Sequence, residues 1–162
     1  MKNNIVVKNV TMDFSDYYAQ KKISEKVKTK FETIDFLAIP KRYDEHGYYF
    51  AQETIDFLKF CRNQSSEHSF DVLADDEIQI RSLHSFDIWM PIIWVSSSIL
   101  LPFAINMVSS YIYDKMKGRE KEDVNIDVSF YVKRDNEEKH IHYSGDAKTF
   151  KENFEKIDLN KM

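Results

Sequence analysis

The stretch 88-IWMPIIWVSSSILLPFAINMVSSYIY-113 contains no charged residue in 26 positions, although Asp, Glu, Lys and Arg make up 31% of the chain. A helix of this length would measure about 39 Å, enough to cross a hydrocarbon core of about 30 Å with some tilt. Aromatic residues stand near both of its ends, as they do at the two surfaces of a membrane: Trp89, Trp94, Tyr111 and Tyr113. The stretch therefore predicts an apolar helical segment that avoids water.

Two prolines divide this segment, because proline suits the first turn of a helix and disrupts its interior. They are Pro91 and Pro102. The part that begins at Pro102 has the features of a complete helix, with Lys115 and Lys117 near its carboxyl end and Gly118 beyond it. We therefore expect one long span, or two shorter helices that form a hairpin in one leaflet or a buried pair within protein.

A stripe of mostly small residues follows one side of the expected helix. At 100° per residue its members fall within about 80° of one another; they are Ser98, Pro102, Asn106 and Ser109. In lipid such a stripe marks the close approach of another helix, and in water it faces a neighbouring element. The serines can instead bond to the backbone of their own helix, which implies no contact. Together with the four aromatic residues, this stripe is the predicted interface with a partner protein, a second copy or a membrane.

The 85 residues before the segment alternate between strand and helix signals. Ile5 and Val7 alternate with polar residues and predict an opening strand, and an amphipathic helix is expected from Ser15 to Phe31. A second helix is predicted over residues 51–63, with Cys61 on its apolar side. The apolar pairs in residues 70–80 predict a β-hairpin.

The part of the chain after the segment has the clearest strand pattern. Apolar and polar residues alternate from Val124 to Phe130, a second strand is expected over residues 139–145, and a helix follows with Phe150 and Phe154 on one side. This order predicts a ββα unit. The chain is accordingly expected to be an α+β protein in three parts, namely residues 1–85, 86–118 and 119–162.

Two histidines on the second of these strands, His140 and His142, are candidate metal ligands. Residues two apart on a strand point to the same face, and imidazole is a common ligand of metals. A third His or Cys at a supporting spacing is missing, so an ordinary exposed strand face is the alternative. His84, near Arg81, is a further candidate for a catalytic side chain.

The composition of the chain narrows the range of possible functions. A net charge of −4 disfavours nucleic acid as a partner, and a single cysteine excludes an internal disulfide within the chain. The amino-terminal sequence has only a three-residue apolar run, so a cytoplasmic location is expected, with a place at the cytoplasmic face of a membrane as a possibility. No cofactor motif is found. The preferred hypothesis is a non-catalytic, membrane-associated adaptor or effector subunit; the alternatives are a subunit that oligomerises through a buried segment, and an enzyme with a site of scattered residues.

Overall fold

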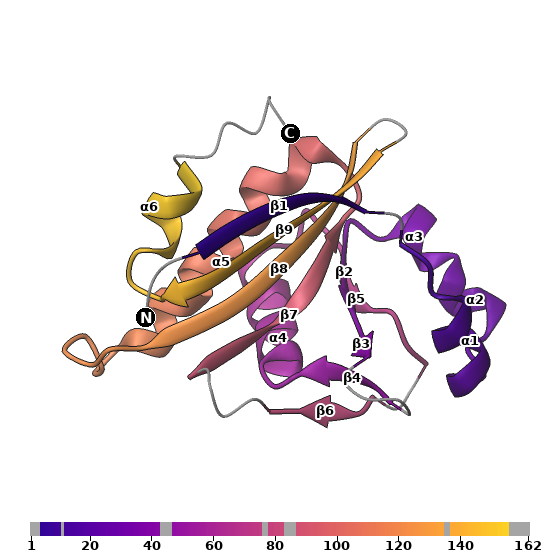
Figure 1. The fold of residues 1–162 in the computed structure, drawn as a ribbon, viewed down its shortest axis with the longest axis horizontal. Helices are drawn as coiled ribbons and strands as arrows, with labels where there is room; N and C mark the ends of the chain where they lie inside the picture. The colour runs from indigo at the N-terminus through magenta and orange to yellow at the C-terminus, as the bar shows by residue number, and fades with distance from the viewer. Residues whose placement is uncertain are drawn as a thin grey trace.

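The computed structural model describes residues 4–10, 12–42, 47–75, 78–82, 87–134 and 137–155. It confirms the α+β class: the chain forms a mixed six-stranded sheet and a small three-stranded sheet, accompanied by helices (Figure 1). In spatial order, the strands of the large sheet are β1 (Asn4–Val10), β9 (Glu137–Asp146), β8 (Asn125–Arg134), β7 (Ile88–Val95), β2 (Phe36–Ile39) and β5 (Phe70–Val72). Those of the small sheet are β3 (Lys41–Arg42), β4 (Tyr48–Ala51) and β6 (Ile80–Arg81).

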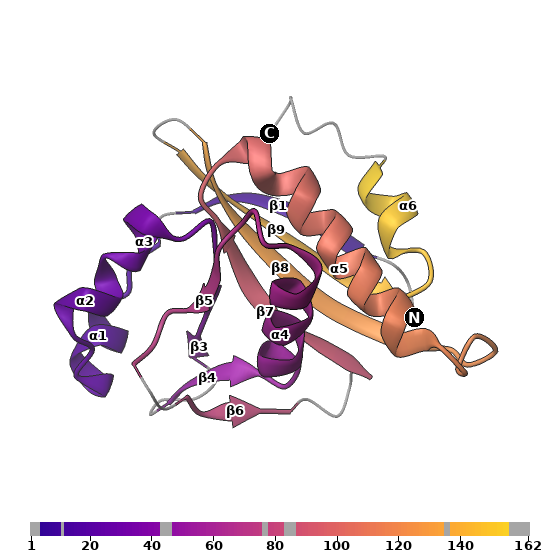
Figure 2. The same ribbon diagram turned by 180° about the vertical axis from the view of Figure 1, so that it is seen from behind.

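The helices divide between the two faces of the large sheet. They are α1 (Ser15–Lys21), α2 (Glu25–Lys28), α3 (Lys30–Thr33), α4 (Thr54–Gln64), α5 (Leu101–Met116) and α6 (Phe150–Glu155), with a short 3₁₀ turn, η1 (Ser98–Leu100), before α5. Helices α4, α5 and α6 pack on one face, which Figure 2 shows from the helix side. The three short helices α1 to α3 lie toward the β2 end of the molecule and pack against the other face. None of the helices in the described ranges covers the rest of that second face, over β8 and β9.

Strand β7 corrects the prediction for the first part of the apolar stretch. Residues 88–95 form a strand, paired in parallel with β8 and antiparallel with β2, so the prediction of a helix there is wrong. A central strand covered on both faces is apolar at nearly every position, and periodicity alone cannot separate it from a buried helix. Pro91 lies where the pairing with β8 shifts between Trp89 and Ile92. A bulge is one of the few places where a sheet tolerates proline.

The second part of the stretch forms a helix as predicted. Helix α5 has Pro102 in its first turn, and Gly118 follows its end with a φ of 81°, in the left-handed region that glycine adopts readily. One side of α5 faces the sheet, with Leu101, Val108 and Ile112 buried. None of the helices in the described part of the chain combines the length and the apolar character that crossing a bilayer requires.

Two other local predictions are wrong. The helix expected from Ser15 to Phe31 is broken into α1, α2 and α3, and Lys22 ends α1 with a φ of 53°. The segments expected to form a hairpin do not pair with each other. Strand β5 pairs in parallel with β2, and β6 pairs in parallel with β4, so tertiary pairing overrides the local turn signal.

Other elements agree with the sequence. Strand β1 and helix α4 occur where they are predicted, and Cys61 is fully buried in the core. Strands β8 and β9 pair antiparallel along their whole length and α6 follows them. These two strands join the large sheet, because β8 pairs with β7 and β9 pairs with β1. Residues from all three predicted parts of the chain therefore contribute strands to one sheet.

Candidate ligand-binding site

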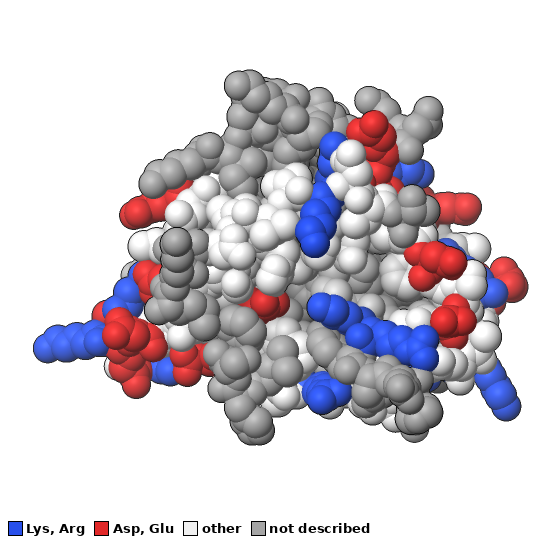
Figure 3. Space-filling model, viewed as in Figure 1, with Lys and Arg blue, Asp and Glu red and all other residues white. Residues whose placement is uncertain are grey.

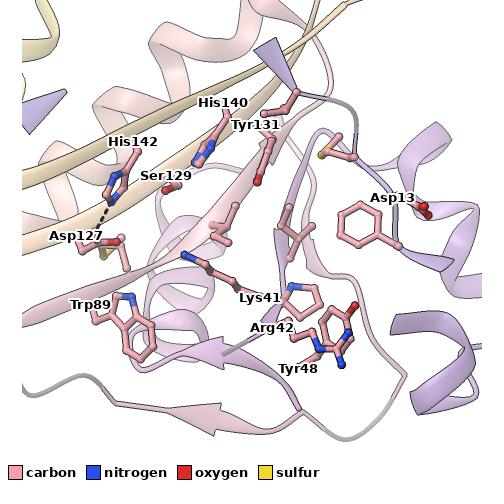
Figure 4. A pocket seen from close by; sticks show the side chains of 17 residues that line it. Asp13, Lys41, Arg42, Tyr48, Trp89, Asp127, Ser129, Tyr131, His140 and His142 are labelled. Carbon is pink, nitrogen blue, oxygen red and sulfur yellow. Dashed lines mark hydrogen bonds and ion pairs between the residues drawn. The ribbon is translucent and has the colours of Figure 1, made fainter. Parts of the chain in front are cut away.

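A pocket of about 420 Å³ lies on the face of the large sheet that α4, α5 and α6 leave open. Its floor comes from β7, β8 and β9, and its sides from Val10, residues 12–14, the end of β2, and strands β3 and β4. Figure 4 shows the side chains that line it. This volume falls in the range of about 300–1,000 Å³ that is usual for pockets that hold small molecules.

The register of β8 and β9 brings the polar side chains of the pocket together. Alternate residues of a strand point to the same face, so Asp127, Ser129 and Tyr131 face the pocket while their neighbours enter the core. Ser129 lies directly opposite His142, and Tyr131 lies directly opposite His140. Five polar or aromatic side chains therefore converge from two adjacent strands.

His142 and Asp127 form the closest polar contact in this group. The Nε2 atom of His142 lies 2.6 Å from the Oδ2 atom of Asp127, and the two side chains are 34% and 18% exposed. An ionised carboxylate only accepts hydrogen bonds, so Nε2 carries the hydrogen and donates it. The pair is fixed at one end of the pocket and remains partly open to solvent.

His140 is held in a different environment. Its ring stacks on Tyr131 with 4.4 Å between ring centroids and 17° between planes. The Nε2 atom of His140 is buried and has no hydrogen-bond partner among the described residues. The pKa of His140 is lowered to about 4, chiefly by burial and also by the nearby His142, Lys41 and Lys8, against an opposing effect of Asp127. His140 is therefore neutral near pH 7.

Basic side chains surround this group. Lys8 on β1 lies opposite His140 in the strand register, and Lys41 reaches into the pocket from β3 toward the side where the histidines lie (Figure 4). Arg42 lines the far end and contacts Asp16 at 3.3 Å. On this face of the molecule, Lys and Arg side chains border a largely uncharged area (Figure 3). The pocket therefore offers basic side chains to a ligand beside the carboxylates of Asp13 and Asp127.

Aromatic and apolar side chains form the remaining walls. Trp89 lies beside His142 and Asp127, whereas Tyr48 stands at the end that Arg42 occupies (Figure 4). Phe14 also lines the pocket. Further rings hold these walls in place: Phe14 stacks on Phe31, and Tyr48 packs against Tyr17 with 5.3 Å between centroids. The pocket thus has one end that carries His142, Asp127 and Lys41, and an aromatic end where Tyr48 lies together with Arg42 and Asp13.

The arrangement allows anion binding and proton transfer, and it gives little support to a metal site. The histidines do face the same side of β9, as predicted, with 6.2 Å between their ring centroids. His142 is paired with Asp127, however, and the described residues contain no group of three or more His, Cys, Asp or Glu side chains placed to hold a metal. His84, the other histidine considered from the sequence, lies outside the described residues.

The residues predicted as an interface are separated by the fold. Trp89 and Trp94 lie in β7, not at the end of a helix, and each is 3% exposed. Trp94 packs edge-on against Phe31 of α3, with 4.8 Å between ring centroids. Tyr111 is buried, and its hydroxyl donates a hydrogen bond of 2.7 Å to Glu53. Of the eight predicted residues, only Trp89 lines the pocket on the sheet.

The others lie on or near the outer side of α5. Pro102, Asn106 and Tyr113 are exposed, whereas Ser98, in η1, is half-buried. Ser109 is also half-buried, and its Oγ atom is buried without a hydrogen-bond partner among the described residues. Asn106, Ser109 and Tyr113 border a second hollow, of about 500 Å³, between α5 and α6. The predicted stripe therefore faces away from the pocket.

Several residues of the pocket were missed by sequence reasoning. Asp127 and Ser129 are polar positions of the predicted strand 124–130 and were assigned only to its polar side. The register between β8 and β9 places them beside the histidines. Lys41 follows a predicted break at Pro40, and no local pattern relates it to residues a hundred positions later. The two predicted strands, 124–130 and 139–145, did carry a usable signal. Both alternate between apolar and polar residues, so pairing them would place their polar residues on one shared face.

Comparison of this chain with known protein families, with curated proteins and with solved structures finds no match. The pocket is therefore the feature of this protein that bears on its function.

Proposed function

We propose that this protein is a binding module that holds a small oxyanion in the pocket on the open face of its large sheet. One observation carries the proposal: the His142–Asp127 pair, the half-buried His140 and the Lys41 side chain all border the same cavity. An anion placed there meets positive charge from Lys41 and Lys8 and hydrogen-bond donors on the imidazole rings. Proteins select ligands with a few such polar groups inside a mostly apolar wall.

The unpartnered Nε2 atom of His140 supports the proposal. A buried polar atom without a hydrogen bond costs about 1–3 kcal/mol, so most such atoms in folded proteins have a partner. A ligand in the pocket would supply one once the ring of His140, which lines the pocket, turned this atom toward it. The same reasoning does not apply to an ordinary exposed strand face, where solvent satisfies every side chain.

Calorimetric titration of the full chain with inorganic phosphate and with acetate tests the proposal. We expect saturable binding of at least one of the two anions, and we expect Lys41→Gln to weaken it about tenfold, as the loss of one charge-assisted contact does. The matched control is Lys59→Gln, because Lys59 is an exposed lysine on α4, on the opposite side of the sheet. Equal affinities of the two variants would contradict the proposal.

Protein–protein interaction, the function expected from the sequence, is a second proposal, and one observation favours it. The ring of Tyr113 is 72% exposed beside the hollow between α5 and α6. Large aromatic side chains are enriched in protein interfaces. Sedimentation over a range of protein concentrations tests self-association through this surface, with Tyr113→Ser expected to reduce it. A single monomeric species for both proteins argues against self-association.

Membrane attachment through residues 86–118, also expected from the sequence, is tested with the same preparation. Flotation with phospholipid vesicles would support it. Protein that stays at the bottom of the gradient, with and without anionic lipid, would exclude it.

A further inference from the structure

We infer that the natural ligand of the pocket is a ring-bearing oxyanion, in which a flat ring carries a phosphate or a carboxylate. This inference rests on the proposed function, which it deepens: the anionic group would occupy the end of the pocket at Lys41, His140 and His142, and the ring would lie toward the aromatic end.

The size of the pocket is the first argument. One water molecule takes about 30 Å³ of liquid volume, so a bare phosphate or acetate ion fills only a small part of a cavity of about 420 Å³. A pocket of this size fits a ligand with a body as well as a charged group. The remainder of the cavity therefore indicates what that body is.

The distribution of charge along the pocket is the second argument. Asp127, His142 and Lys41 lie near one end, and Tyr48 lies near the other together with Arg42 and Asp13 (Figure 4). Arg42 is paired with Asp16, and Asp13 accepts hydrogen bonds from Ser15. Between the two ends the lining is apolar and includes Met12, Ile39, Pro40 and Ile92. A ligand that matches this order carries its charge at one end of an apolar body.

The aromatic walls are the third argument, because they are held rigidly in place. Tyr131 is fixed by stacking on His140, and its burial raises the pKa of its hydroxyl, so it stays neutral. Phe14 and Tyr48 are each supported by a further ring behind them. Rings prefer offset-stacked or edge-to-face contacts with other rings, and a wall whose rings cannot turn away favours a flat ligand over a flexible chain.

Two matched pairs of compounds test the inference on the full chain. Phenyl phosphate is compared with inorganic phosphate, and benzoate with acetate, by calorimetric titration. We expect the ring to increase affinity at least tenfold in one of the pairs, and the pair that shows the gain identifies the anionic group. Cyclohexyl phosphate is the control for flatness, and we expect it to bind several-fold more weakly than phenyl phosphate.

Substitutions in the pocket test where the ring of the ligand binds. Tyr131→Leu is expected to reduce the gain from the ring at least threefold, whereas Lys59→Leu, at an exposed position of α4, leaves it unchanged. If Tyr131→Leu does not fold, as judged by its circular dichroism spectrum, Tyr48→Leu replaces it. Equal affinity with and without the ring overturns the inference and leaves the anion site standing. No binding of any of these compounds overturns the proposed function as well.

Discussion

Across strands β8 and β9, the Nε2 atom of His142 lies 2.6 Å from a carboxylate oxygen of Asp127. This contact connects the two adjacent strands that form the floor of the pocket. It places a proton donor and a negative charge next to the side chains of Ser129 and His140. The same contact links two strands, and its contribution to the free energy of unfolding can be measured.

Replacing Asp127 with Asn is expected to lower the free energy of unfolding by about 1 kcal/mol. The amide still accepts a hydrogen bond, but the bond loses the strengthening that the ionised acceptor provides. Urea denaturation measures the change, and Asp123→Asn, at an exposed position in the loop before β8, is the matched control with no expected effect. Equal stability of the two variants would show that the contact contributes nothing.

Stability is expected to fall below about pH 6.5 because of His140. Burial and the positive charge of its neighbours lower the pKa of His140 from 6.5 to about 4 in the folded protein. The unfolded chain therefore takes up a proton first as the pH falls, and the folded state loses stability between these two values. We expect a loss of about 1–2 kcal/mol between pH 6.5 and pH 5 that is absent in His140→Gln.

Denaturation of both proteins at a series of pH values provides the measurement. The groups that face His140 are Lys8 on β1, Lys41 on β3, Asp127 and Tyr131 on β8, and His142 on β9. They are the same in both proteins, so the difference isolates His140. Parallel curves for the two proteins would contradict the assignment of a buried, neutral imidazole.

Cys61 is expected to be inert in the folded protein. The side chain is fully buried on the core-facing side of α4, and burial raises the pKa of its thiol to about 12. Because the thiolate is the reactive form, a disulfide reagent at pH 8 should label the native protein at least about a hundredfold more slowly than the unfolded chain. Rapid labelling of the native protein would show that α4 does not pack as described.

Two isoleucines of this protein differ sharply in how far their side chains are exposed to solvent. Ile126 on β8 is completely buried, whereas Ile99 in η1 is 85% exposed. Ile126→Ala is expected to lower the free energy of unfolding by about 2–5 kcal/mol, because it removes buried methyl groups and leaves a cavity. Ile99→Ala should change it by no more than about 0.5 kcal/mol. Similar losses in thermal denaturation would contradict the placement of β8 in the core.

Local sequence patterns correctly predicted the elements that bury one side and expose the other. The alternation from Val124 to Phe130 identified β8, and Pro102 together with Gly118 identified the limits of α5. The same reasoning failed for β7, because a strand covered on both faces has no polar side to reveal its period. It also failed for residues 70–80, where β5 and β6 pair with distant strands.

The candidate site was predictable only in part. The spacing of His140 and His142 correctly indicated that they share a face. From the sequence, a third metal ligand was sought among histidines and cysteines, so Asp127 was not considered as the partner of His142. Asp127 and Lys41 reach the histidines only through the order of strands in the sheet and the position of β3 beside it. Sequence alone does not specify that order, since each of these contacts joins residues far apart in the chain or on strands whose register is not known in advance.

The measurement that tests the central claim most directly is the NMR titration of the histidine side chains with inorganic phosphate and with acetate. His68, which packs against Phe36 and Phe103 on the helix side of the sheet, is an internal reference. The account predicts saturable shifts in the ring signals of His140 and His142 with at least one anion, while those of His68 stay constant. Unchanged signals of both pocket histidines at saturating concentrations of either anion would contradict it.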